Sequence, residues 1–142
     1  MRDDLSVVEY STDMSWVRAP MLTGFFVGWP SPPSPERHLA ALAGSYRVVL
    51  ARHEQRVVGF VNAISDGVAT AFVPWLEVLP DYQRGGIGRE LVNRLLAQLD
   101  GLYSIDLTCD LPLVGFYRSL GFQELAGMGL RRPTALAHPP VH

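Results

Sequence analysis

The chain has 142 residues, 48% of them apolar and 18% charged, with a formal net charge of −2 and a pI near 6.0. This composition is that of one globular domain rather than a disordered chain, and it lacks the broad basic field of a nucleic-acid-binding protein. The single cysteine, Cys109, excludes an internal disulfide and a thiolate zinc cluster. The absence of a long apolar run predicts no membrane segment and a cytoplasmic location.

The first half of the chain predicts a strand, two helices and a hairpin. A short strand is expected over residues 4–10, and a helix near Asp13, where Ser and Thr provide N-cap candidates. A second helix is expected over residues 35–45, after a Pro-rich loop. Alternating apolar residues over 46–53 and 57–65, separated by a turn at EQR, indicate a hairpin.

The second half alternates strands with helices. The expected elements are a strand over 69–80, a helix ending near Leu99, a strand over 103–110, a helix over 112–122, one or two strands within 122–132, and a loosely held tail over 133–142. This order predicts a single α/β domain with a mixed sheet of about six to seven strands and about four helices. The front half of the sheet should be antiparallel, with a parallel connection later in the chain.

The stretch DYQRGGIGREL, residues 81–91, joins the strand over 69–80 to the next helix and is typical of an anion-binding turn. It is not a nucleotide P-loop, because Gly88 is followed by Arg89 rather than Lys. It is not a dinucleotide fingerprint, because Leu91 occupies the third glycine position. The remaining pattern, Q/R-x-x-G-x-G/A, is matched by Gln83, Gly86 and Gly88.

Two blocks in this order resemble the GNAT superfamily of acetyl-CoA-dependent N-acetyltransferases. The first is LEVLPDYQRGGIGRELVNRLL and the second is CDLPLVGFYRSLGF, and the resemblance extends over residues 46–130. Within the superfamily the chain resembles small bacterial members and, more distantly, plant chloroplast serotonin-type acetyltransferases. The resemblance implies a GNAT fold in which residues 1–45 form variable acceptor-side helices and residues 46–132 form the cofactor-binding core.

The chemistry of the loop agrees with a pyrophosphate ligand. Glycines allow close backbone approach, and the first helical turn supplies unpaired N–H donors and a positive dipole end. A tight turn carrying surface arginines remains the structural alternative. By resemblance, the pantetheine arm pairs like an added strand with the backbone of Leu76 and Val78, in a gap between two splayed strands. The cofactor-binding residues implied are Leu76, Val78, Gln83, Arg84, Gly85, Gly86, Ile87, Gly88, Arg89, Asp110 and Tyr117.

Acetyl transfer needs a base for the amine, a donor for the oxyanion and an acid for the CoA thiolate. The resemblance makes Tyr117 the acid and the Val78 N–H the oxyanion donor, whereas packing beside Phe116 is the alternative for Tyr117. The base is open: Glu77 is one candidate, Asp106 is a weaker one, and water is a third. Side chains alternate along a strand, so Glu77 should lie on the opposite face from Leu76 and Val78. There its carboxylate could instead pair with an arginine.

Asp110 stands where the family often has asparagine, and it could hold pantetheine, hold the substrate ammonium or cap the next helix. The scattered histidines predict no metal site, and Cys109 is interpreted as a packing residue. Phe25, Phe26 and Trp29 could line the acceptor pocket or pack helices onto the sheet.

The expected reaction is direct acetyl transfer from acetyl-CoA to a small-molecule primary amine. An acetyl-CoA-binding sensor without turnover and a transferase for a longer acyl-CoA are the alternatives. A homodimer that pairs the terminal strand near residues 128–132 is a further expectation, and neither nucleic acid nor membrane is an expected partner.

Overall fold

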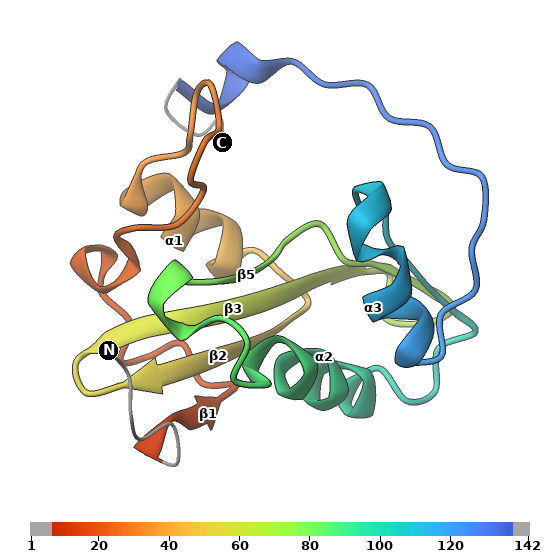
Figure 1. The fold of residues 1–142 in the computed structure, drawn as a ribbon, viewed down its shortest axis with the longest axis horizontal. Helices are drawn as coiled ribbons and strands as arrows, with labels where there is room; N and C mark the ends of the chain where they lie inside the picture. Colours follow the sequence, from red (N-terminus) through yellow and green to blue (C-terminus); the bar gives the residue numbers. More distant parts are fainter. Residues whose placement is uncertain (1–6, 138–142) are drawn as a thin grey trace.

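In a computed structural model that describes residues 7–137, the chain forms one mixed sheet with three α-helices (Figure 1). The predicted fold class is therefore confirmed, with slightly fewer helices than expected. The strands are β1 (Glu9–Ser11), β2 (Arg47–His53), β3 (Arg56–Ser65), β4 (Thr70–Phe72), β5 (Leu76–Val78) and β6 (Ser104–Asp106). The helices are α1 (Pro35–Ala43), α2 (Ile87–Gln98) and α3 (Val114–Ser119), with short 3-10 turns at Ala19–Leu22, Pro80–Tyr82, Leu111–Leu113 and Pro133–Ala137.

The sheet runs in the order β1-β2-β3-β4-β6, and β5 also pairs with β3. All pairings are antiparallel except that of β4 with β6, which is the predicted parallel connection across α2. The expected strand over 69–80 is interrupted around Pro74, because proline cannot donate to a strand ladder. Its first part, β4, pairs with β6, whereas its second part, β5, pairs with no described strand except β3, so the sheet opens between β5 and β6.

Helices cover both faces of the β2–β3 hairpin. Alternate residues of β2 enter separate cores: Val49 and Ala51 pack in the cluster that contains α2, whereas Val48 and Leu50 pack in the cluster that contains Leu42 of α1. Because both faces of the hairpin are buried, its sequence is almost continuously apolar rather than alternating with charge. This rigid centre supports β5 and the start of α2.

Two expectations about local structure were wrong. No helix begins near Asp13; its carboxylate instead accepts hydrogen bonds from the backbone N–H of Ser15 at 3.0 Å and from its hydroxyl at 2.8 Å. Such a local side-chain turn competes with helix formation. No strand forms within residues 122–132 either, and that segment runs exposed around the outside of the molecule (Figure 1).

The two ends of the chain are only partly described. Residues 4–6 of the expected first strand lie outside the described residues, and so do residues 138–142 of the tail. The described part of the tail is the turn Pro133–Ala137, where the Ala135 carbonyl accepts a 2.8 Å hydrogen bond from Arg37 of α1.

Candidate active site

A cavity of about 640 Å³ lies where β5 leaves the rest of the sheet. It is bounded by β5, the glycine loop with the start of α2, and α3, with the loop around Phe25 at one end. The site residues expected from sequence that line it are Leu76, Glu77, Val78, Gln83, Arg84, Gly86, Ile87, Gly88, Arg89 and Tyr117. Gly85, Asp106 and Asp110 are not among the lining residues.

The backbone of β5 presents unpaired groups to this cavity. The Leu79 N–H donates to the Val58 carbonyl, and the Trp75 carbonyl accepts from the Asn62 N–H, so the odd-numbered positions face β3. In a strand the backbone groups alternate in direction, and those of Leu76 and Val78 therefore point away from β3. The Val78 carbonyl is already used, because the Gln83 side-chain amide donates to it at 3.0 Å. What remains at this edge is the Leu76 N–H and carbonyl and the Val78 N–H.

The glycine loop leads directly into α2. Gly86 occupies the N-cap position with φ of +87°, in the left-handed region that favours glycine, and a Cβ there would meet nothing within 4 Å. Ile87 is buried and fixes the first turn of α2 to the core. Among residues 7–137 no side chain caps this helix end, so its first N–H groups are available to a ligand.

The two loop arginines differ in their environments. Arg89 donates to the Ser119 hydroxyl at 2.7 Å, and that hydroxyl donates to the Phe116 carbonyl at 2.6 Å, which ties α2 to α3. Arg84 is exposed, with φ of +69°, an uncommon conformation for a residue other than glycine. Both guanidinium groups add positive charge at the mouth of the cavity.

Tyr117 is held at the α3 side of the cavity and is only 8% exposed. Its ring packs edge-on against Phe116 and Phe122, with centroid distances of 5.0 and 5.7 Å. Burial, with a smaller contribution from nearby Cys109, raises the pKa of the Tyr117 phenol to about 12. The hydroxyl is therefore protonated throughout the neutral range, which an acid requires.

Glu77 lies on the opposite side of β5 and still lines the cavity. Its Oε1 accepts a 2.8 Å hydrogen bond from the Phe26 backbone N–H, so its partner is a loop amide and not the arginine considered from sequence. Burial raises the pKa of the Glu77 carboxyl, and this hydrogen bond opposes the shift in part. A carboxylate with raised pKa at a cavity wall is suited to accept a proton near neutral pH.

The aromatic loop both lines the cavity and packs against the sheet. Phe25 lines the cavity, whereas Phe26 is buried and packs against Trp29 and Trp75 at centroid distances of 4.9 and 5.0 Å. This packing aims the Phe26 N–H at Glu77. Local sequence patterns do not predict that contact, because 51 residues separate the two partners.

His38 is a residue whose importance sequence reasoning missed. It is 1% exposed, its ring centroid lies 4.3 Å from that of Phe60, and neither ring nitrogen has a hydrogen-bond partner among the described residues. Burial lowers the pKa of His38 to about 4, so the ring is neutral at pH 7. The sequence signal that could have predicted the burial of His38 was its position on the apolar side of the helix PERHLAALA.

The acidic candidates on the other side of the opening are less well placed. Asp106 and Asp110 are exposed, and the Asp110 side chain makes no capping hydrogen bond to the turn that follows it. Cys109 is also exposed, in contrast to the packing role expected for it. Within residues 7–137 there is neither a cluster of three metal-ligating side chains nor a helix long and apolar enough to span a membrane.

Residues 14–122 match the model of the acetyltransferase (GNAT) family. The chain belongs to the GNAT family. Its fold is shared by a Deinococcus radiodurans R1 protein, described as a candidate acetyltransferase, with a TM-score of 0.94, 40% identity and 99% of both chains covered. A GNAT-family acetyltransferase of Streptococcus pneumoniae has a TM-score of 0.73 and 30% identity, over 88% of this chain and 98% of that one.

Curated GNAT relatives include plant proteins. The histone acetyltransferase TAP1 of Glycine max is 33% identical over 68% of this chain and 47% of its own length. The chloroplastic serotonin N-acetyltransferase 2 of Oryza sativa is 44% identical over 47% of this chain and 34% of its own length. This GNAT chain thus spans less than half of the length of the first curated relatives that it matches. Members of this family are acetyltransferases, and the family generally uses acetyl-CoA.

Proposed function

We propose that this GNAT protein transfers an acetyl group from acetyl-CoA to a small primary amine by direct attack. The observation that carries the proposal is the convergence of three groups on one cavity: the unpaired edge of β5, the carboxyl of Glu77 and the phenol of Tyr117. Each group fits one requirement of acyl transfer, namely carbonyl polarisation, proton removal and proton donation.

The residues present fit acetyl-CoA. The open cradle at Gly86 and the uncapped start of α2 suit a pyrophosphate, since N–H donors and the helix dipole favour negative charge. Arg84 and Arg89 add charge beside it. The unpaired Leu76 and Val78 groups suit an extended arm with amide donors and acceptors, which would pair as an additional strand. Bound there, acetyl-CoA supplies an activated thioester.

The chemical step balances within these residues. Glu77 accepts a proton from the substrate ammonium, directly or through water, and the amine nitrogen forms a bond to the acetyl carbon. The Val78 N–H donates to the carbonyl oxygen as negative charge develops on it. The carbon–sulfur bond breaks, and Tyr117 gives its proton to the departing sulfur. The attacking nitrogen loses its second proton to water, and the products are the N-acetylated amine and CoA. Glu77 returns its proton to solvent and Tyr117 regains one, so one proton is released in each turnover.

The proposed acceptor is a small cation rather than a protein. Glu77 is the only carboxylate that lines the described cavity, so it provides the local attraction for an ammonium group. Phe25 and Val27 line the same end of the cavity and would contact the apolar part of the amine. The net charge of −2 also favours cationic over acidic substrates.

A panel of amines assayed by release of the CoA thiol tests the proposal. Aryl-alkylamines, polyamines, amino sugars and lysine peptides should be compared, with acetyl-CoA and longer acyl-CoAs as donors. We expect turnover of at least one small amine with acetyl-CoA. Tight acetyl-CoA binding without turnover of any acceptor would instead favour a sensor, and turnover of peptides alone would contradict the small-amine assignment.

A further inference from the structure

Phe26 has a strained backbone conformation. Its φ is +63°, in the left-handed region, which is an outlier for a bulky side chain. Gly24 and Gly28, two residues away on either side, also have positive φ, at +94° and +83°, and glycine adopts such values without a steric cost. Of these three positions only Phe26 carries a side chain. Strain of this kind gathers at functional sites, where the surrounding structure imposes it.

Aromatic contacts hold Phe26 in this conformation. The residue is 4% exposed, and its ring packs against those of Trp29, His38 and Trp75 at centroid distances of 4.9, 5.0 and 5.0 Å. Its carbonyl accepts a 3.2 Å hydrogen bond from the Trp29 N–H. A strained residue persists only where several contacts fix it together, and both the ring and the backbone of Phe26 are fixed here.

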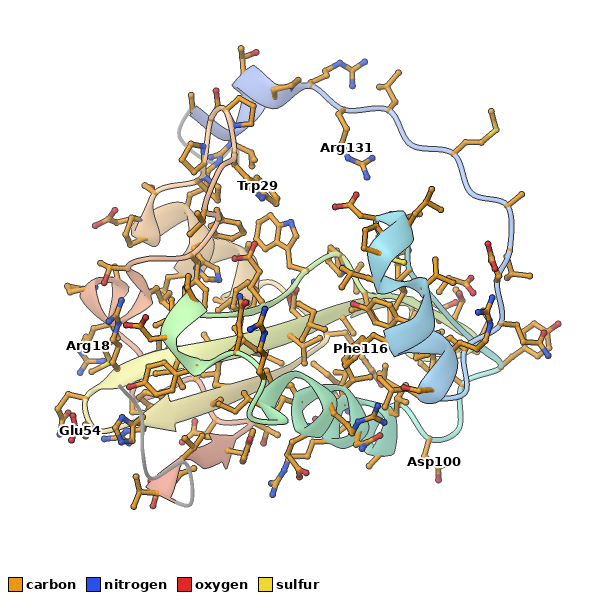
Figure 2. The ribbon with its side chains drawn as sticks, viewed as in Figure 1. Arg18, Trp29, Glu54, Asp100, Phe116 and Arg131 are labelled. Atoms are coloured by element: carbon orange, nitrogen blue, oxygen red, sulfur yellow. The ribbon has the colours of Figure 1, made fainter. Side chains whose placement is uncertain are left out.

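The turn over residues 24–28, the Phe26 turn, is also anchored to the sheet. The Thr23 carbonyl just before it accepts a 3.0 Å hydrogen bond from Arg56 of β3, and a Cβ on Gly24 would lie only 2.8 Å from the same guanidinium. Trp29, just after the turn, lies on the α1 side of the molecule, away from Phe116 of α3 (Figure 2). The Phe26 turn and α3 therefore reach the cavity from different sides.

The strained conformation directs one N–H group at Glu77. The Phe26 N–H donates to Glu77 Oε1 at 2.8 Å, across 51 residues of sequence. Glu77 is paired with Phe60 of β3, so the two side chains lie on the same face of the sheet, and the Phe60 ring packs against Phe26. Within residues 7–137 the carboxylate has no other hydrogen bond and no ion pair. Its second oxygen, Oε2, is therefore available at the cavity wall.

No charged side chain shares the task of orienting this carboxylate. The charged or titratable groups around Glu77 line the same cavity or contact the Phe26 turn and its start: Tyr82, Arg84, Arg89, Tyr117, His38 and Arg56. None of them bonds to the carboxylate within residues 7–137. The orientation of the Glu77 carboxylate thus depends on one backbone N–H.

We propose that Phe26 is a positioning residue for Glu77, and that its backbone N–H holds Oε1 so that Oε2 is directed to the amine. This role rests on the proposed function, in which Glu77 removes a proton from the acceptor. Phe25 and Val27, on either side of Phe26, line the end of the cavity assigned to the acceptor. An amine that touches them contacts the turn that holds its base, so recognition of the acceptor and orientation of the carboxylate are linked.

An ester in place of one amide removes this N–H alone. Phenyllactic acid, the hydroxy-acid analogue of phenylalanine, introduced at position 26 of the full chain keeps the ring and its contacts. The N–H favours the ionised carboxylate, so its loss should raise the pKa of Glu77 further. NMR of the side-chain carboxyl carbons in the free protein should then show the Glu77 titration midpoint at higher pH.

The pH–rate profile should follow the same shift. The fall of kcat/KM on the acidic side should move to higher pH together with the NMR midpoint. Below the midpoint kcat/KM should drop roughly tenfold, the scale of one hydrogen bond to a charged group. A residue that only supported the fold would not move the two midpoints together.

Phenyllactic acid at position 25 is the matched control. Within residues 7–137 neither the Phe25 N–H nor the Gly24 carbonyl forms a hydrogen bond, so this ester should leave both midpoints in place. An unchanged NMR midpoint in the position-26 ester, or an equal shift in the control, would overturn the role of Phe26 and leave Glu77 as the base. A raised NMR midpoint with an unmoved rate profile would contradict Glu77 as the base, and the role of Phe26 with it.

Discussion

At the scale of single residues, Tyr117 provides the sharpest test of the chemistry. Tyr117→Phe keeps the ring that packs against Phe116 and Phe122 and removes only the hydroxyl. We expect kcat to fall by roughly 10²-fold, the lower end of the range for acid–base catalysis. The KM for acetyl-CoA should change much less, since the lost interaction forms mainly in the transition state.

Steady-state kinetics with an acceptor whose chemical step is rate-limiting makes this measurement. Tyr10→Phe, which removes a hydroxyl from a strand at the far end of the sheet, is the matched control and should leave kcat unchanged. A Tyr117→Phe enzyme with native kcat would mean that the thiolate leaves without help from this phenol, and Tyr117 would then be a packing residue.

Glu77 should control the acidic side of the pH–rate profile. Burial raises the pKa of its carboxyl, so the fraction able to accept a proton falls as pH decreases through that raised value. Glu77→Gln keeps an oxygen for the Phe26 N–H and should lower kcat/KM by roughly 10²-fold. The remaining kcat/KM of Glu77→Gln should no longer fall as pH decreases. Glu36→Gln, on the exposed first turn of α1, should keep the native pH dependence. An unchanged profile in Glu77→Gln would favour water as the base.

His38 should make folding stability pH-dependent. Its pKa is about 4 in the folded chain, compared with 6.5 when unperturbed, so between these values the unfolded chain binds more protons. The free energy of unfolding should therefore fall as pH decreases from 6.5 to 4, by about 3 kcal/mol for a shift of this size. Urea unfolding across this range should show that His38→Leu removes the slope, and an equal slope in both proteins would contradict the assignment.

At the scale of elements, the start of α2 should decide acetyl-CoA affinity. Gly86→Val places a β-branched side chain in the cradle, so we expect at least a tenfold loss of affinity, which corresponds to about 1.4 kcal/mol. Gly101→Val is the matched control, because Gly101 follows the other end of α2, also has positive φ and also has open space around it. Calorimetry should show native affinity in the control. Equal affinities in the two variants would mean that the loop is only a tight turn.

The elements also show where local sequence signals suffice. The β2–β3 hairpin and the passage from β5 through the loop into α2 were predicted because short apolar runs, turn residues and glycines act over a few positions. The helix expected near Asp13 failed because the Asp13 carboxylate binds Ser15 locally, and cap residues also form turns. The strand expected over 69–80 forms at the expected position but is interrupted around Pro74, and this interruption opens the cavity.

At the scale of the whole molecule, the missed features depend on contacts between distant segments. The Phe26–Glu77 hydrogen bond and the burial of His38 among aromatic rings require the loop before α1 to pack onto the far side of β5. No periodicity encodes such packing, since it depends on the final arrangement of rings. Residues 122–132 have a strand pattern, yet no strand of the described chain pairs with them, so the expected terminal strand does not form there.

The alternating direction of the β5 backbone has a consequence for amide hydrogen exchange. In the free protein the Leu79 N–H is bonded to β3 and should exchange slowly, whereas the Val78 N–H, one residue away, should exchange quickly. Saturation with CoA should slow Leu76 and Val78 while leaving Leu79 as it was. Site-resolved exchange by NMR would thus record an odd–even contrast in the free protein that disappears on binding. Uniform slowing along the strand would indicate general tightening of the fold instead of pairing at one edge.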